Sequence, residues 1–299
     1  MSRIFEALQR SESERSGTLP QIATELLEAV ERDAPESAPV SPVVTPASDA
    51  VPPTPSDLGH SRTLPVVVLP ESRLVSLTEQ ESLAAEKFRF LGVRLRQLQQ
   101  TRPLKKILIT STLPEEGKSL VAANLAATLA RRKQQKVLLL EGDLRRPVIG
   151  RQIGHPQIPG ITEWLHDSSS PINNIYYLDE PGHWFLPAGS PPENPLELMQ
   201  TGKLHSLLEQ LTASFDWIII DSPPLLPLAD TSVWARFADG VLLVVREGKT
   251  EKRQLQRGLA ALDTSRLLGM VVNSSSGTDN KNYYSRYGSA AAGSQGTAQ

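Results

Sequence analysis

A Gly-Lys-Ser triplet at residues 117–119 has the residue types that bind phosphate. It closes a loop, Ser111–Ser119, that follows the apolar run Ile107–Thr110 and precedes the alanine-rich stretch Leu120–Arg131. A strand, a loop and a helix in this order predict a P-loop, in which backbone N–H groups and the helix dipole surround a phosphate. A chance triplet in a turn is the alternative, and the flanking strand and helix disfavour it.

Each residue of the triplet has an expected task. Gly117 would let the backbone approach the phosphates, Lys118 would reach the β and γ phosphates, and the Ser119 hydroxyl would bind Mg²⁺. The loop departs from the usual pattern because Thr112 stands where a P-loop begins with Gly, and because two glutamates add negative charge near the phosphates. The predicted nucleotide-binding residues of the loop are Pro114, Glu115, Glu116, Gly117, Lys118, Ser119 and Leu120.

Two later apolar runs end in carboxylates. One leads into Glu141 and Asp143, and the other leads into Asp221. In an open α/β sheet, ligands bind at the carboxyl ends of the strands, so we expect these acids to face the P-loop. Either acidic site alone is explained as a helix N-cap, but three sites in register favour a metal site. Mg²⁺ prefers hard oxygen ligands, and the predicted ligands are Ser119, Asp143 and Asp221.

The elements that must position these residues are apolar runs that alternate with helical stretches. Each run is apolar on consecutive residues, which is typical of parallel strands covered by helices on both faces. We therefore predict an α/β fold: a P-loop NTPase-like doubly wound, mostly parallel sheet with helices on both faces. An apolar stripe also predicts a packed helix over Leu83–Gln99. The predicted strands are Ile107–Thr110, Val137–Leu140, Trp217–Ile220, Val241–Val245 and Leu267–Val272, with a weaker one at Ile175–Leu178.

Composition divides the chain into three predicted regions. The first contains two short amphipathic patches, Ser2–Arg15 and Gln21–Asp33, which are either marginal helices or docking peptides. A proline-rich stretch, Pro35–Pro65, follows and is expected to be a disordered spacer, with a proline-rich ligand as the alternative. The tail is poor in apolar residues and is expected to be flexible. The predicted regions are an N-terminal extension at 1–75, a P-loop domain at 76–275 and a tail at 276–299.

The charge and residue balance exclude several classes of function. The 299 residues carry a formal net charge of −2, with five histidines and no cysteine. This balance gives no general attraction to nucleic acid, so no nucleic-acid partner is expected. Disulfides, thiol catalysis and thiolate metal sites are excluded, and the histidines lack metal-ligand spacing. No run approaches the roughly 20 apolar residues of a membrane-spanning helix, and no secretory signal begins the sequence, so we expect a cytoplasmic protein.

Three motifs together make the chain similar to the bacterial tyrosine autokinases of capsule and exopolysaccharide synthesis. The family's degenerate Walker A loop, Pro-x-Glu-Gly-Lys-Ser, resembles Pro114–Ser119. Its Walker A′ motif, Asp-x-Asp-x-Arg, resembles Glu141–Arg145, and its Walker B motif, Asp-Ser-Pro-Pro, stands unchanged at Asp221–Pro224. The likeness covers about Ser76 to Asn273. Further similar features are Asp230, the stretch from Leu186-Pro187-Ala188-Gly189 to Asn194-Pro195, and the C-terminal tyrosines.

The resemblance implies an ATP-dependent protein-tyrosine kinase that uses Mg²⁺. Carried over by position, Lys118 steadies the transferred phosphate, while Ser119 and Asp221 hold the ion. Asp143 assists the ion, and Glu141 is the candidate base for the tyrosine proton. The catalytic residues so implied are Lys118, Glu141, Asp143 and Asp221, and the further cofactor-binding residues are Arg145 and Asn273.

The tail holds Tyr283, Tyr284 and Tyr287, three of the five tyrosines in the chain. A tail with few apolar residues could enter the active site of a neighbouring subunit, so these three are the predicted phosphoacceptors. Incidental aromatic residues are the alternative. Asn273, at the end of the last predicted strand, is expected to contact the adenine as in related proteins or to form a turn.

Two departures from the family pattern bear on activity and assembly. Glu141 replaces the usual Asp, and its extra methylene displaces the carboxylate, which bears on phosphoryl transfer rather than on nucleotide binding. The family's Glu-x-x-Arg-x-x-Arg helix, which seats neighbouring subunits in a ring, is matched by Glu86 and Arg89 but not by Gly92. Either Arg94 substitutes or the ring is weaker, and we expect a homo-oligomer through helix 83–99.

The resemblance also implies partners. Kinases of this family often depend on a membrane-embedded activator or polysaccharide chain-length protein, which would recruit this chain to the inner face of the membrane. A phosphotyrosine phosphatase is the expected opposing enzyme.

Two other functions stay open at this stage. A P-loop ATPase of the partitioning or division-placement type usually has a second Lys early in the loop, and here Leu113 and Pro114 occupy that region. A catalytically weak nucleotide-binding scaffold, recruited through the N-terminal patches, is the third hypothesis and is consistent with Glu141.

Overall fold

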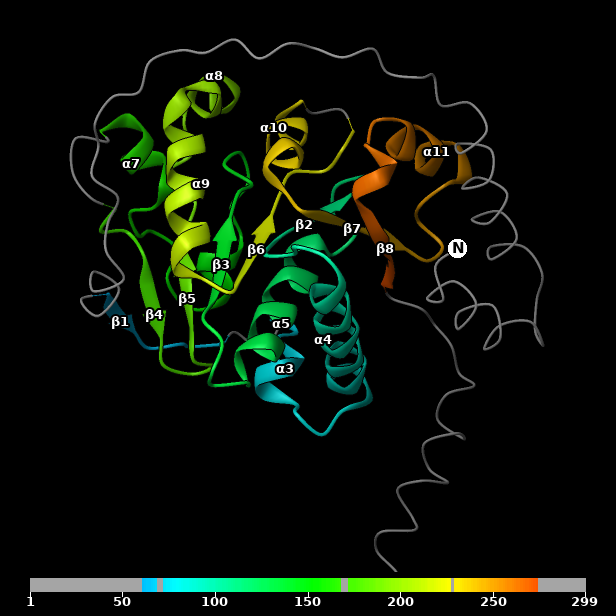
Figure 1. The fold of residues 1–299 in the computed structure, drawn as a ribbon, viewed down its shortest axis with the longest axis horizontal. Coiled ribbons are helices and arrows are strands. Elements are labelled where there is room, and N and C mark those ends of the chain that lie inside the picture. The colour runs from blue at the N-terminus through cyan, green and yellow to red at the C-terminus, as the bar shows by residue number, and fades with distance from the viewer. Residues whose placement is uncertain (1–60, 69–71, 168–171, 227–228, 274–299) are drawn as a thin grey trace, which may run out of the picture. The chain divides into compact units, whose positions relative to one another are not determined.

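The computed structural model describes residues 61–68, 72–167, 172–226 and 229–273. These residues form one eight-stranded sheet in the order β1-β4-β5-β3-β6-β2-β7-β8, with helices on both faces (Figure 1). The strands are β1 Arg62–Leu64, β2 Lys106–Ser111, β3 Val137–Glu141, β4 Tyr176–Leu178, β5 His183–Leu186, β6 Trp217–Asp221, β7 Gly240–Arg246 and β8 Leu267–Asn273. The helices are α3 Val75–Thr78, α4 Leu83–Thr101, α5 Lys118–Ala130, α6 Ile149–Gln152, α7 Ile161–His166, α8 Pro195–Gln200, α9 Gly202–Ser214, α10 Asp230–Phe237 and α11 Lys252–Ala260, with a short 3₁₀ turn at Thr264–Arg266.

The pairing of the strands confirms the predicted fold class. Neighbouring strands run parallel throughout this sheet except at β4 and β5, which pair antiparallel. The predicted strands all form, with ends that differ from prediction by at most one residue, and the helix predicted over Leu83–Gln99 is α4, which continues to Thr101. No helix within the described ranges combines the length and the apolar character needed to cross a membrane.

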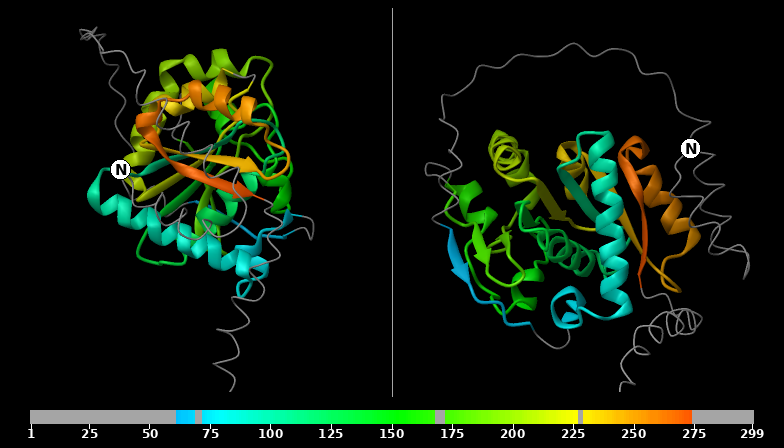
Figure 2. Two further views of the ribbon diagram at one scale, coloured as in Figure 1. Left: turned by 90° about the vertical axis from the view of Figure 1, so that its right-hand side faces the viewer. Right: turned by 60° about the horizontal axis from the view of Figure 1, so that its bottom comes forward.

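Both faces of the sheet are buried, which explains why its strands are apolar on consecutive residues. Side chains alternate along each strand, so Leu108 faces a cluster that includes α7 to α11, while Ile107 and Ile109 face a cluster that includes α4 to α6. Figure 2 shows these two helix layers on opposite sides of the sheet. Trp217 and Trp234 are among the largest fully buried side chains and lie in different clusters.

Two strands are not indicated by the apolar pattern. β1 falls inside the stretch predicted to be a disordered spacer, yet Arg62–Leu64 pairs in register with β4 at the edge of the sheet. The sequence His183–Leu186 of β5 begins with a histidine and is too short to give a pattern. The limits of the three predicted regions stay predictions. The patches at 2–15 and 21–33 and the tyrosines at 283, 284 and 287 lie outside the described residues.

The topology brings the three predicted motifs together at the carboxyl ends of the central strands. β2, which leads into the P-loop, lies between β6 and β7, and β3 lies beside β6. Because these strands are parallel, their carboxyl ends meet, and Glu141 pairs in register with Asp221. The Gly142 N–H then donates to the Asp221 backbone oxygen at 2.7 Å, and the Trp234 ring N–H donates to the Gly142 oxygen at 3.0 Å.

We predict that Gly142→Ala destabilises the fold, because a Cβ there would lie 2.8 Å from the backbone oxygen of Asp221 and 2.8 Å from the Trp234 ring. Such overpacking typically costs about 1 to 3 kcal/mol. Gly202→Ala is the matched control, since nothing lies within 4 Å of a Cβ at that position. Urea unfolding of the two variants checks the prediction, and equal stabilities would contradict it.

Candidate nucleotide-binding site

The P-loop joins β2 to α5 through a left-handed turn. Gly117, the residue before α5, has φ +96°, a conformation that favours glycine. A Cβ at this position would also lie 2.0 Å from the side-chain nitrogen of Asn273, at the end of β8. Glycine is therefore required here both by the backbone and by the close approach of Asn273. Leu120 lies half-buried in the first turn of α5, and Pro114 is exposed.

The Lys118 ammonium is surrounded by carboxylates. Its Nζ lies 2.8 Å from Asp143 Oδ2, 3.9 Å from Asp221 Oδ1 and 3.3 Å from Ser119 Oγ. Burial lowers the pKa of Lys118, but the charges of Asp221, Asp143 and Glu141 outweigh burial and raise that pKa above its ordinary value. The lysine is therefore charged, as a group that binds phosphate must be, and it faces the predicted metal ligands.

Asp221 is buried, and its carboxylate is poorly satisfied. It has no exposed surface, and neither of its side-chain oxygens has a hydrogen-bond partner of normal geometry among the residues that the structure describes. Burial raises the pKa of Asp221 to about 6, although the Lys118 ammonium and the Ser119 hydroxyl oppose that shift. A buried carboxylate that lacks well-placed donors is unfavourable unless a cation binds to it, so this residue fits a Mg²⁺ ligand.

The other predicted ligands are within reach of the same ammonium. Asp143 accepts the Arg146 N–H at 3.1 Å through the oxygen that Lys118 does not contact. No group of three or more His, Asp or Glu side chains in the described part of the chain could hold a metal ion alone. Mg²⁺ is usually bound by one or two carboxylates together with waters and substrate phosphates.

Glu141, the candidate base, has its carboxylate bound to the backbone. One oxygen accepts the N–H groups of Val148 and Ile149 at 2.7 and 2.5 Å, and the other accepts the Ala188 N–H at 3.3 Å. Burial raises the pKa of Glu141 to about 7, and these donors oppose the shift. Glu141 thereby joins the end of β3 to the start of α6 and to the loop that follows β5.

Arg145 of the A′ motif forms a two-pronged contact with Asp230, the first residue of α10. Its Nε and Nη2 lie 2.5 and 3.1 Å from the two carboxylate oxygens, and Asp230 is almost fully buried. A hydrogen bond to Asp230 raises the pKa of Arg145. This pair fixes the segment after β3 against α10, on the side where Trp234 contacts Gly142.

The two acidic residues of the P-loop have different surroundings. Glu115 is exposed, has φ +62°, and forms an ion pair with Lys249 at 2.9 Å. Glu116 has no exposed surface, and its carboxylate accepts the Leu113 N–H at 2.8 Å and the Thr250 hydroxyl. Lys249 and Thr250 were not singled out from the sequence, because a turn between a strand and a helix gives no signal of what it contacts.

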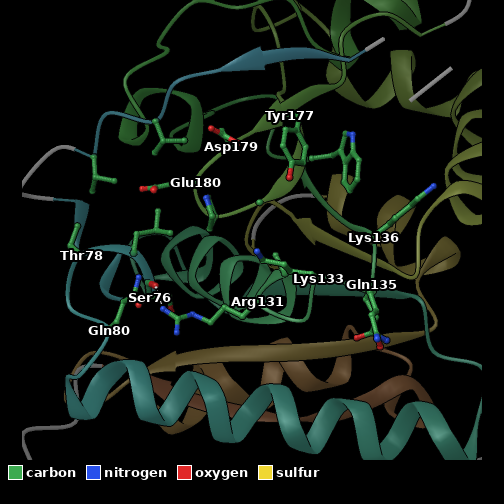
Figure 3. Close-up of a pocket in the computed structure, with 18 residues that line it drawn as sticks. Ser76, Thr78, Gln80, Arg131, Lys133, Gln135, Lys136, Tyr177, Asp179 and Glu180 are labelled. Carbon is green, nitrogen blue, oxygen red and sulfur yellow. Dashed lines mark hydrogen bonds between the residues drawn. The ribbon is translucent and has the colours of Figure 1, made fainter. Parts of the chain in front are cut away.

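A groove of about 910 Å³ lies away from these residues. It lies at the C-terminal end of α5, between the turn that leads to β3 and the β4–β5 hairpin (Figure 3). Arg131, Lys133 and Lys136 line one part of it, and Asp179 and Glu180 line another. None of the predicted site residues lines this groove.

No family model matches the chain, but its relatives are clear. The tyrosine-protein kinase YwqD of Bacillus subtilis (strain 168) is 35% identical over 205 residues, which cover 68% of this chain and 86% of YwqD. The chain belongs to the bacterial tyrosine-protein kinase family. The tyrosine-protein kinase CpsD of Streptococcus pneumoniae serotype 4 is 33% identical over 57% of this chain and 76% of CpsD.

A longer relative and two solved structures are also similar to this chain. The succinoglycan biosynthesis transport protein ExoP of Rhizobium meliloti (strain 1021) is 32% identical over 68% of this chain, which matches only 26% of ExoP. The chimerical protein CapA2B2 has a TM-score of 0.62 at 27% identity, over 73% of this chain and 95% of that one. The VpsO kinase domain has a TM-score of 0.56 at 31% identity, over 64% and 98% of the two chains.

We predict that Asp221→Asn is more stable than the parent at pH 8. The pKa of Asp221 is about 6 in the folded protein, above the ordinary value of 3.8, so the folded state binds more protons than the unfolded state between these values. Stability contributed by this group therefore falls as pH rises through that window. This loss amounts to roughly 3 kcal/mol for two pKa units, and an uncharged Asn escapes it. The net gain of the variant is smaller than that, because Lys118 loses a charged partner.

Urea unfolding at pH 8 and pH 4 checks this. The gain of the variant, about 1 to 2 kcal/mol at pH 8, should shrink at pH 4, where Asp221 is itself protonated in the folded protein. Asp179→Asn, which removes an exposed carboxylate, controls for net charge. A variant that is less stable than the parent at pH 8 would show that the Asp221 charge is stabilised in the fold.

Proposed function

We propose that this protein is an ATP-dependent protein-tyrosine kinase that phosphorylates its own C-terminal tyrosines and so regulates exopolysaccharide or capsule synthesis and export. The observation that carries the proposal is the grouping of Lys118, Ser119, Asp143 and Asp221 at the end of the central strands. Membership of the tyrosine-protein kinase family supports the choice of reaction over simple ATP hydrolysis. Tyr283, Tyr284 and Tyr287 are the proposed acceptors.

The residues of the site have distinct tasks in this proposal. The P-loop backbone and the start of α5 bind the phosphates, and Lys118 contacts the transferred group. Ser119, Asp143 and Asp221 hold Mg²⁺, which when bound neutralises negative charge on the phosphates. Arg145 and Asn273 complete the proposed nucleotide site. Asn273, which lies against Gly117, is the proposed contact to the adenine.

The proton of the acceptor tyrosine needs a carboxylate. A tyrosine hydroxyl has a pKa near 10, so a carboxylate accepts its proton only late, as the oxygen attacks phosphorus. Glu141 is the proposed acceptor, and burial, which raises its pKa to about 7, makes it a stronger base. Its three backbone donors limit its movement, so positioning and charge neutralisation carry most of the proposed rate enhancement.

Helix α4 is the proposed contact between copies of this chain. Glu86 and Arg89 form an ion pair on its surface at 2.5 Å, and Phe90 and Val93 are 62% and 47% exposed. Gly92, in the third position of the family's motif, is buried against α5, where a Cβ would lie 3.5 Å from Thr128. That position therefore adds no cation to the proposed interface.

A membrane partner is part of the same proposal. ExoP is named as a transport protein of succinoglycan biosynthesis, and the chain matches only a quarter of it. CapA2B2 is a chimerical protein. The name of ExoP supports a membrane-embedded activator or chain-length protein that brings this chain to the inner face of the membrane. A phosphotyrosine phosphatase would reverse the modification.

Labelled ATP tests the proposed reaction. The full chain, incubated with γ-labelled ATP and Mg²⁺, should transfer label to tyrosine, and Lys118→Met should reduce transfer by at least about 100-fold because the transferred group loses its cation. Replacing the three tail tyrosines with Phe should remove the label but leave nucleotide binding intact.

Other outcomes point to other functions. Free phosphate without phosphotyrosine would indicate an ATPase, and binding without either product would indicate a scaffold. Lys133→Met, which removes an exposed cation from the turn after α5, is the control for loss of charge. Equal transfer by Lys118→Met and the parent would overturn the assignment of the site.

A further inference from the structure

The P-loop is held from the side by a segment far away in the sequence. The loop between β7 and α11, residues 247–251, contacts it through Thr250, whose hydroxyl donates to the carboxylate of Glu116. The same carboxylate accepts the Leu113 N–H at 2.8 Å, and the Asn273 side chain donates to the Glu116 backbone oxygen at 2.9 Å. Contacts from Leu113 within the P-loop, from Thr250 and from the end of β8 therefore meet at Glu116.

The direction of the Thr250 hydrogen bond follows from the carboxylate, which can only accept. The Thr250 hydroxyl therefore gives its single proton to Glu116. The Thr250 oxygen in turn accepts the Arg246 N–H at 3.0 Å. A continuous chain of hydrogen bonds thus runs from the end of β7 through Thr250 and Glu116 to Leu113.

Burial makes this chain of bonds important for the loop. Glu116 has no exposed surface, and a buried charge without hydrogen bonds is strongly unfavourable. Loss of the Thr250 hydroxyl would leave one carboxylate oxygen short of a donor and would favour a loop conformation in which Glu116 reaches water. The Glu115–Lys249 ion pair is exposed, with 81% and 41% of the two side chains accessible, and contributes little by comparison.

We propose that Thr250 is a positioning residue, which fixes the Glu116 carboxylate so that Leu113–Gly117 keeps the conformation that binds a triphosphate. This role rests on the proposed function, since it presumes that the P-loop binds nucleotide. Thr250 acts through Glu116 and does not itself contact the phosphates.

Calorimetric titration of the full-length protein tests this role with two probes, MgATP and Mg²⁺-tripolyphosphate. Thr250→Val keeps the shape of the side chain and removes the donor, and it should weaken both ligands by about ten-fold, the effect of losing one hydrogen bond to a charged group. Thr250→Ser restores the donor and should recover most of the affinity. In the kinase assay, the loss in Thr250→Val should appear mainly as a higher KM for ATP.

Matched controls separate positioning from general destabilisation. Thr212→Val removes a hydroxyl that bonds mainly to its own helix, at Leu208 O, and should bind both probes as the parent does. Glu116→Ala removes the acceptor and should weaken binding like Thr250→Val, and the double variant should be no weaker than the worse single variant, because both changes remove the same bond. This pair keeps the test decisive if valine at 250 lowers stability.

Several results would overturn the role of Thr250. Unchanged affinity in Thr250→Val or additive losses in the double variant would each overturn it. A loss of affinity confined to MgATP would also overturn it, because such a loss would indicate contact with the adenine instead. A parent chain that binds neither probe would overturn the proposed function as well. A parent that binds both probes, with a Thr250→Val variant that equals it, would overturn the positioning role alone.

Discussion

The site depends on one buried ammonium that lies among carboxylates. Lys118 brings together the start of α5, the segment just after β3 and the end of β6, because its charge is attracted by Asp143 and Asp221. The buried charges of this group balance one another, so the three elements are coupled electrostatically as well as by packing. The parallel pairing of β2, β6 and β3 makes the grouping possible, since it places all three strand ends on one edge.

Around this centre, further polar residues hold backbone groups and one another. Glu141 binds N–H groups of α6 and of the loop after β5, and Glu116 binds the P-loop itself. Arg145 is paired with Asp230. Of the two P-loop glutamates, Glu116 is thus engaged by a backbone donor and Glu115 by Lys249, which reduces their repulsion of an anion.

Much of the fold could be predicted from the sequence because its signals are local. Consecutive apolar residues marked five buried strands, and the Gly-Lys-Ser triplet with its flanking strand and helix marked the turn at Gly117. β1 and β5 could not be predicted, because strands of three or four residues at or near the edge of a sheet acquire their structure from their neighbours. For the candidate site, the residue types followed from the sequence motifs, and their shared location at the carboxyl ends of the strands followed from the predicted parallel topology.

The partners of those residues did not follow, because they depend on side-chain directions across the fold. Nothing in the sequence near Thr250 indicates that it contacts Glu116, which lies 134 positions away. The three donors to Glu141 come from two segments that only the folded sheet brings together. The replacement of Asp by Glu at this position is visible in the sequence, whereas the backbone groups that its longer side chain reaches are visible only in the structure.

The position of Asn273 couples the last described strand to the turn that begins α5. This residue ends β8, and its side-chain nitrogen donates to the Glu116 backbone oxygen at 2.9 Å. The same nitrogen would lie 2.0 Å from a Cβ at Gly117. A displacement of the end of β8 would therefore reach this turn directly, without being transmitted through the sheet.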